Sequence, residues 1–330
     1  MTPKKLLRAA WIVPALAGMS FLLAASAACA KEPVILSTDV GNEIDDQWAI
    51  AYLLTDAQDF DVLGIISAQA PTLPSPSAHY TYQILVDEVE NHLNMVEHPP
   101  LLEGSSFPLE DTKTPQRSEG ADFIVNASKA FSDRRRLTVL TIGAATDVAS
   151  AILEDRSITE RIRVVAMGFK SWPEGGDEFN VENDPRAWQV ILSSDVPVTV
   201  GCADVCRANL SLTLDQARQL VSRHGLVGAW LWAEFQAWYY RFVKPLRQDD
   251  FSKPWVIWDI ITLAYVQGWT TQQVYPRPVL GDDLEFKPGP PGQTITWITS
   301  LDSKRLWADF LKKLDAYERS HALRGRGQDR

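Results

Sequence analysis

The chain has 330 residues, of which 45% are hydrophobic, and its 42 acidic residues outnumber 32 Lys and Arg, giving a net charge of −10. This composition is typical of a globular protein and excludes disordered and fibrous classes. The acidic balance argues against nucleic acid as a partner, because nucleic-acid binders need a basic face. Twelve Trp residues are roughly two to three times the number expected for this length.

The first 30 residues have the pattern of an export signal. Lys4, Lys5 and Arg8 precede an apolar run at 11–25, and small residues around Cys29 offer a cleavage site before Lys31. This pattern predicts a secretory signal peptide at 1–30 and a periplasmic or secreted protein, with no stable membrane span. Lipid anchoring at Cys29 is the less favoured alternative, because the triplet before it lacks an aliphatic residue.

Apolar runs that alternate with helical patterns follow in the remaining chain. Buried strands are predicted at 34–36, 61–67, 136–143, 162–168 and 196–200. Helices are predicted from Asp45 and at 77–93, 146–153 and 184–192. Uniformly apolar strands alternating with helices indicate an α/β fold with an open, mostly parallel sheet and helices on both faces.

The C-terminal third changes character but shows no linker. Residues 214–268 are helical and aromatic, and a Gly- and Pro-rich loop, a last strand and an amphipathic helix follow at 282–291, 294–299 and 306–317. We therefore expect one domain at 31–317 and a charged, frayed tail at 318–330. The apolar helix at 226–238 offers a face for a second subunit, so a homo-oligomer is an open alternative.

Two cysteines remain after the signal peptide. Cys202 and Cys206 are four residues apart, and in an exported protein such a pair could close a small disulfide loop. Two thiols alone are too few for a zinc site. We leave open whether they are bridged.

An acidic turn follows the first strand. Asp39, Glu43, Asp45 and Asp46 are four carboxylates within eight residues, and like charges repel unless a cation lies among them. Hard oxygen ligands select Ca²⁺ or Mg²⁺. Helix capping explains one or two of the acids but not four, and the spacing is not that of an EF-hand. A metal site here needs ligands from elsewhere, and Asp259, before an apolar helix, is a candidate.

A second polar group follows the fourth strand. Glu178 and Asn180 offer an acceptor and an amide two residues apart, which suits the binding of vicinal hydroxyls. Asp184 and Pro185 have the pattern of a helix N-cap followed by proline in the first turn.

Together these segments resemble the inosine-uridine preferring nucleoside hydrolase family. The turn at 39–46 is similar to the family's Asp-x-Gly-x-Asp-Asp motif with two extra residues, and Glu-Phe-Asn followed by Asp-Pro at 178–185 matches its spacing. Residues 141–149 are similar to its Gly-Pro-Leu-Thr-Asn-x-Ala segment, and Met167-Gly168 resembles its Met-Gly-Gly strand end. The resemblance runs in order through 34–314.

The resemblance implies a calcium-dependent hydrolysis of the N-glycosidic bond of ribonucleosides. It implies that one Ca²⁺ is held by Asp39, Asp46, Asp259 and the backbone carbonyl of Ile142. Asp45 is then the general base for a calcium-bound water, whose single attack inverts the anomeric centre. For the substrate, the resemblance implies contacts with Glu178, Asn180, Met167 and Trp258.

Departures from the family pattern leave the leaving group open. Trp258 stands where some members have a His that protonates the departing base, and Lys170 lies in a stretch that lacks the family's Gly-Asn pair. Trp258 and the aromatic residues at 230–240 either form a wall for a base or pack in the core. Two alternatives stay open: a nucleoside- or sugar-binding protein with little turnover, and a hydrolase of another glycosidic bond.

Overall fold

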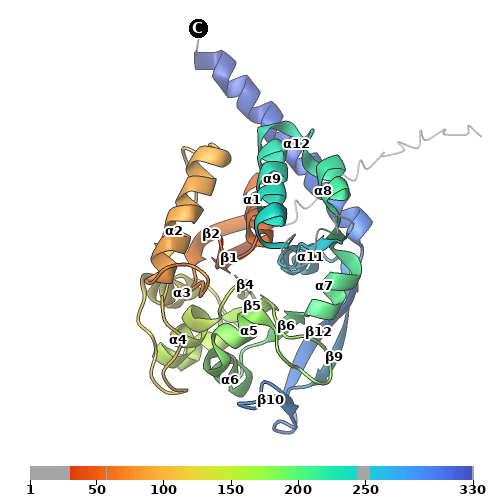
Figure 1. The fold of residues 1–330 in the computed structure, drawn as a ribbon. Helices are drawn as coiled ribbons and strands as arrows, with labels where there is room; N and C mark the ends of the chain where they lie inside the picture. Colours follow the sequence, from red (N-terminus) through yellow and green to blue (C-terminus); the bar gives the residue numbers. More distant parts are fainter. Residues whose placement is uncertain (1–29, 57, 244–252, 329–330) are drawn as a thin grey trace, which may run out of the picture. The chain divides into compact units, whose positions relative to one another are not determined.

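The computed structural model describes residues 30–56, 58–243 and 253–328 (Figure 1). The predicted signal peptide therefore lies outside the described residues, apart from Ala30. From Lys31 onwards the chain forms one compact unit. Within the described ranges, every helix is too short or too polar to cross a bilayer.

An eight-stranded sheet forms the centre of this unit. Its strand order is β3-β2-β1-β4-β5-β6-β12-β9, and every pairing is parallel except that of β12 with β9. The strands are β1 Glu32–Thr38, β2 Phe60–Ser67, β3 Leu101–Glu103, β4 Leu137–Thr141, β5 Ile162–Met167, β6 Val198–Gly201, β9 Thr270–Pro276 and β12 Thr294–Leu301. The predicted open, mostly parallel α/β sheet is confirmed.

Helices cover both faces of the sheet, as alternating side chains of the strands require. Leu36 and Leu140 belong to one buried cluster with α1, α9, α11 and α12, whereas Ile35 and Val139 belong to another with α3, α4 and α6. Figure 1 shows the two groups of helices on either side of the sheet. The helices are α1 Asp45–Thr55, α2 Ser77–Asp87, α3 Glu119–Ser128, α4 Thr146–Glu154, α5 Phe179–Asn183, α6 Pro185–Ser193, α7 Ala203–Asn209, α8 Leu214–Val221, α9 Gly225–Trp238, α11 Ile260–Val266 and α12 Ser303–Gln328.

Short elements complete the chain. A π-helical turn at Glu88–His92 extends α2, another at Tyr239–Val243 extends α9, and Arg156–Glu160 is a 3₁₀ turn. Two small hairpin pairs are formed by β7 Ser211–Leu212 with β8 Trp255–Val256 and by β10 Val279–Leu280 with β11 Phe286–Lys287. As the sequence indicates, Asp184 caps α6 by accepting from the Ala187 N–H at 2.9 Å.

The C-terminal helix is longer than expected. α12 continues to Gln328, whereas the sequence predicted a helix that ends at residue 317 and a frayed tail at 318–330. Charged residues such as Glu318 and Arg319 are strong helix formers, so their charge gives no reason for the helix to stop. The first half of α12 packs on α1, where Trp48 contacts Trp307 and Phe310 edge to face or tilted.

An ion-pair cluster fastens the end of α1 to α12. Lys313 pairs with Asp56, with Asp59 at 3.1 Å and with Asp309 at 2.6 Å. Tyr52 donates a hydrogen bond of 2.8 Å to Asp309. The helix that begins with Asp45 and Asp46 is thus held at its other end by the C-terminal part of the chain.

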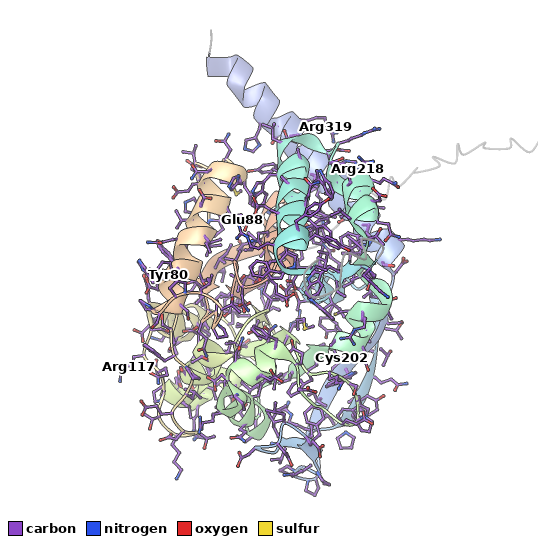
Figure 2. All side chains as sticks on the ribbon, in the orientation of Figure 1. Tyr80, Glu88, Arg117, Cys202, Arg218 and Arg319 are labelled. Atoms are coloured by element: carbon purple, nitrogen blue, oxygen red, sulfur yellow. The ribbon has the colours of Figure 1, made fainter. Side chains whose placement is uncertain are left out.

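The two cysteines are not bridged. Both thiols are free and buried. Cys202, labelled in Figure 2, directly precedes α7 and belongs to the cluster on one face of the sheet. Cys206 belongs to the cluster on the other face. The small disulfide loop that the sequence allowed is therefore not formed, because each side chain packs into a different core.

Candidate active site

One pocket contains all nine residues that the sequence analysis assigned to catalysis, metal binding or substrate binding. It lies where parallel strands end, the usual place for ligands in open α/β sheets. The nine predicted residues that line it are Asp39, Asp45, Asp46, Ile142, Met167, Glu178, Asn180, Trp258 and Asp259. The structure adds Asn42, Glu43, Lys170, Asp177, Phe179, Ala203 and Arg207 to this lining.

The ends of secondary-structure elements position these side chains. Asp39 directly follows β1, Ile142 directly follows β4, and Met167 is the last residue of β5. Asp45 and Asp46 open α1, and Asp259 precedes the first residue of α11. Residues more than 200 positions apart in the sequence therefore meet at one edge of the sheet.

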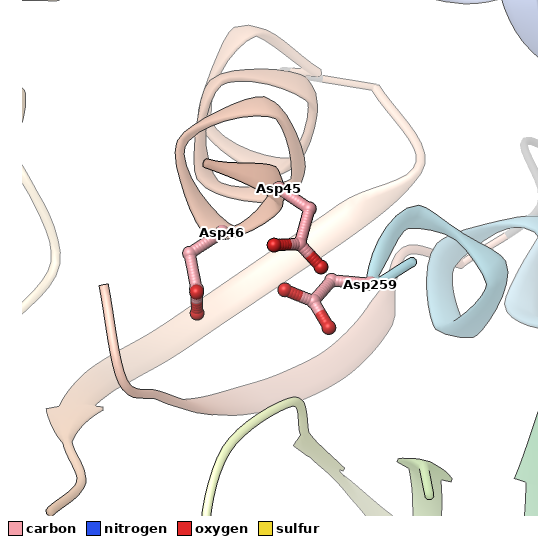
Figure 3. Close-up of side chains that lie close together, drawn as sticks. All are labelled: Asp45, Asp46 and Asp259. Atoms are coloured by element: carbon pink, nitrogen blue, oxygen red, sulfur yellow. The ribbon is translucent and has the colours of Figure 1, made fainter. Parts of the chain in front are cut away.

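Three carboxylates face one another in the centre of the pocket. Asp45, Asp46 and Asp259 each place an oxygen within 4.8 Å of oxygens of the other two, with Asp45 and Asp259 directed at each other from α1 and α11 (Figure 3). Their exposed fractions are only 2–4%. Burial, and then repulsion from the neighbouring acids, raises the pKa of Asp45 and Asp259, and burial raises that of Asp46 to about 7.

Asp39 is held beside this group by its surroundings. Asn42 Nδ2 donates to Asp39 Oδ2 at 2.8 Å, and Thr38 Oγ1 donates to Asp46. Burial raises the Asp39 pKa, and Asp46 and Asp45 raise it further. Gly143 lies against the same side chain, so closely that a Cβ at this position would be 2.7 Å from Asp39 Oδ1.

This donor set fits a divalent hard cation. All four carboxylates are nearly inaccessible and repel one another, and a bound ion of charge +2 would remove that repulsion. The two basic side chains that line the pocket pair with other acids, not with these four carboxylates. Lys170 pairs with Asp177 at 3.4 Å, and Arg207 pairs with Asp204 at 3.2 Å. Asp45 belongs to the same close group as Asp46 and Asp259, so geometry alone does not separate a base from the ligands.

Asn180 has a structural contact that the sequence did not reveal. Its Nδ2 donates to the Ile142 carbonyl at 3.0 Å and to the Met167 carbonyl at 3.3 Å, and so joins the ends of β4 and β5. Glu178 caps α5 by accepting from the Val181 N–H at 3.2 Å, and burial raises its pKa to about 7.

Glu43 was counted in the acidic turn but given no role. Glu43 lines the pocket, and burial raises its pKa to about 7. Hydrogen bonds from the Trp255 and Trp258 side chains act in the opposite direction and lower the pKa by less than burial raises it. Arg207 had no sequence signal. It reaches the pocket from α7, with its guanidinium 5.4 Å from the centre of the Trp258 ring.

The aromatic residues near Trp258 divide into two groups. Trp258 lines the pocket. Phe235 is fully buried in the core, and Trp230, Trp232 and Trp238 pack against that core. The aromatic residues of α9 therefore pack in the core. Whether Trp258 forms a wall for a base stays open.

Comparisons with known proteins identify the family of this chain and its fold. The family model described as inosine-uridine preferring nucleoside hydrolase matches residues 34–308. A solved plant nucleoside hydrolase is 17% identical with a TM-score of 0.67, over 86% of this chain and 99% of its own. A purine-preferring ribonucleoside hydrolase from Gardnerella vaginalis is also 17% identical, with a TM-score of 0.66 over 87% and 99%.

A curated relative adds only a partial match. An uncharacterised protein of Schizosaccharomyces pombe is 28% identical over 137 residues, which are 39% of this chain and 44% of that protein. The structural likenesses show the shared fold, and the family model covers most of the chain. The chain therefore belongs to the inosine-uridine preferring nucleoside hydrolase family.

Proposed function

We propose that this protein hydrolyses the N-glycosidic bond of ribonucleosides or related N-ribosides and that it requires Ca²⁺. The observation that carries the proposal is the convergence of nine predicted residues in one pocket, with four buried carboxylates at its centre. Family membership supports the same reaction class.

The carboxylates divide between holding the metal and moving a proton. Asp39, Asp46, Asp259 and the Ile142 carbonyl would hold the ion, which supplies Lewis-acid polarisation of a water and of sugar hydroxyls. Asp45 accepts the proton of the attacking water. Burial raises the pKa of Asp45, and a cation bound at the neighbouring carboxylates would keep it ionised at neutral pH.

Glu178 and Asn180 hold the sugar. Both side chains line the pocket, and two acceptors at this spacing suit two ring hydroxyls. The negative charge of Glu178 also stabilises the positive charge that develops on the ribose ring as the glycosidic bond breaks. Attack by one water, without a protein nucleophile, inverts the anomeric centre.

The leaving base faces Trp258 rather than a histidine. An indole ring offers a flat apolar surface against which a base can stack. Because this side chain cannot donate a proton to a leaving nitrogen as His does, the chain favours substrates whose base departs readily. Because Trp258 stands in place of a histidine, two other functions compete with this one: a binding protein with little turnover, and a hydrolase of another glycosidic bond.

A product assay on the mature protein distinguishes these functions. Inosine, uridine, adenosine and cytidine are each incubated with Ca²⁺, and free base and reducing ribose are measured. We expect at least one to be cleaved, and EDTA to abolish cleavage. Binding of ribonucleosides without cleavage of any would establish the binding protein, and cleavage of another glycoside alone would establish the third function.

Two variants separate the base from the ligands. Asp45→Ala should lose turnover but keep calcium binding, measured by titration calorimetry, whereas Asp259→Ala should lose both. If Asp45→Ala loses calcium as Asp259→Ala does, Asp45 is a ligand and another carboxylate is the base. Asp59→Ala is the control, because this acid lies in the Lys313 cluster, outside the pocket.

A further inference from the structure

Two basic side chains line a pocket that is otherwise strongly acidic. Seven of its lining residues are carboxylic acids, and the two basic ones are Lys170 and Arg207. A divalent ion at the buried carboxylates accounts for much of the acidity. Neither basic residue is required for holding that ion or a sugar, so their presence calls for a separate explanation.

Backbone hydrogen bonds hold these two residues on the same side of the pocket. The chain turns after β5 at Phe169, whose φ is 63°, and the Ala203 N–H of α7 donates to the Phe169 carbonyl at 3.0 Å. The Asp204 N–H donates to the Lys170 carbonyl at 3.1 Å. The start of α7 is thereby joined to the Lys170 loop, and Arg207 follows one turn later on the same helix.

Arg207 is also positioned against the proposed wall for the base. Its guanidinium lies 5.4 Å from the centre of the Trp258 ring, and the Cys206 thiol beside it donates to the Trp258 carbonyl at 3.5 Å. A group attached to a ligand that contacts Trp258 is therefore within the region that Arg207 can reach. Guanidinium groups bind phosphate and carboxylate through paired hydrogen bonds.

The present ion pairs of both residues are exchangeable. The Lys170 and Arg207 side chains are 55% and 59% exposed, and their partners Asp177 and Asp204 are 68% and 57% exposed. Exposed pairs of this kind contribute little to stability. An anion of the substrate can replace such a partner at little energetic cost.

We propose that the pocket selects ribosides that carry an anionic group, a phosphate or a carboxylate, and that Lys170 and Arg207 recognise this group. The proposal rests on the N-riboside hydrolase function above and names its substrate class. Opposite charges within one pocket orient such a substrate, with its neutral sugar at the carboxylates and its anion at the basic residues. Phosphate on the sugar and carboxylate on the base are the two sources of this charge.

The test compares matched neutral and anionic ribosides. Inosine is compared with inosine 5′-phosphate, and uridine with orotidine, which carries a carboxylate on the same base. The readout is the ratio of kcat/KM for the anionic over the neutral member at low salt. We expect a ratio of about 10 or more for at least one pair and a marked fall in 0.5 M salt. The pair that shows it identifies the source of the charge.

Charge-removing variants assign the preference to the two residues. Lys170→Met and Arg207→Met should each lower the ratio about five-fold or more, and Arg207→Lys should restore part of it. Arg305→Met is the matched control, because Arg305 also lies over an indole ring, 5.2 Å from the centre of Trp269, but outside the pocket. A wild-type ratio of 1 or less in both pairs, or a ratio that neither variant changes, would overturn the proposal.

Binding measurements keep this test separate from the hydrolase function. If no riboside is cleaved, the same four compounds are titrated into wild-type protein with Ca²⁺ by calorimetry. Tighter binding of an anionic member that depends on Lys170 and Arg207 supports the anion proposal although hydrolysis has failed. Equal binding of neutral and anionic members refutes it, and so does a preference that persists in both variants, because the anion is then held by the calcium ion alone.

Discussion

Replacing Gly143 by alanine tests whether Asp39 belongs to the metal site. Gly143 follows Ile142 at the end of β4, and an added Cβ would lie 2.7, 2.8 and 2.9 Å from Oδ1, Cγ and Cβ of Asp39. Because the Asp39 Cβ is itself too close, rotation of the side chain cannot relieve the clash. Asp39 is only 2% exposed and is held by Asn42, so it has little room to withdraw.

The required movement is large on the scale of metal coordination. Ordinary van der Waals contact begins at 3.4 Å, so the carboxylate oxygen and the new methyl group must separate by a further 0.7 Å. Calcium–oxygen distances span only about 0.3 Å, from roughly 2.3 to 2.6 Å. We therefore expect Gly143→Ala to weaken calcium binding about 10- to 100-fold, with a loss of about 1–3 kcal/mol in the free energy of unfolding.

Titration calorimetry on calcium-depleted protein measures the first quantity, and urea unfolding in EDTA measures the second. Gly168→Ala is the matched control, since Gly168 follows β5 as Gly143 follows β4, and its added Cβ meets only contacts of 3.4 Å or more with Trp188, Val181 and Glu178. If Gly143→Ala binds calcium as tightly as the control does, Asp39 is not a ligand, and the proposed ligand set of the metal site is wrong.

Two further predictions concern pH and the sugar site. In EDTA, the Tm should fall as the pH rises from 5 to 8, because Asp46 and Glu178 each have a pKa near 7 in the folded protein and about 4 when unfolded, so the folded state binds more protons over this range. The free energy of unfolding falls by about 1.4 kcal/mol for each unit by which the folded pKa exceeds the unfolded one. Excess Ca²⁺ should reduce this loss. A Tm in EDTA that is flat or rises with pH would contradict the prediction. Asn180→Leu should lower the free energy of unfolding by about 1–3 kcal/mol, because the Ile142 and Met167 carbonyls lose their donor. The same variant should lose turnover. An unchanged kcat would show that Asn180 is not part of the sugar site.

The buried strands were predictable because burial on both faces leaves a strong apolar signal. Residues 34–36 and 162–168 illustrate this, since they are apolar and form β1 and β5. β9 and β3 were missed for different reasons. β9, Thr270–Pro276, is a largely exposed edge strand with a polar sequence, and β3 has only three residues.

The candidate site was predictable where chemistry is concentrated in a short segment. Asp39, Asp45 and Asp46 lie in one turn, and their charges would repel without a cation, so the sequence itself indicates a site. Arg207 lies in no such segment. It reaches the pocket because α7 is hydrogen-bonded to the turn after β5, a contact between elements that no local pattern encodes.

The cluster around Lys313 has a consequence for how the protein matures. The acidic turn at residues 39–46 is made early in synthesis, but the helix that carries Asp45 and Asp46 gains its contacts with Trp307 and its ion pairs with Lys313 only when α12 has been made. Asp259 also arrives late in the chain. Contacts between such distant segments form late in folding, because long loops must close first. We therefore expect calcium binding at the proposed site to require the nearly complete chain, and a nascent or truncated form that lacks α12 to have the acidic turn without a stable ion site.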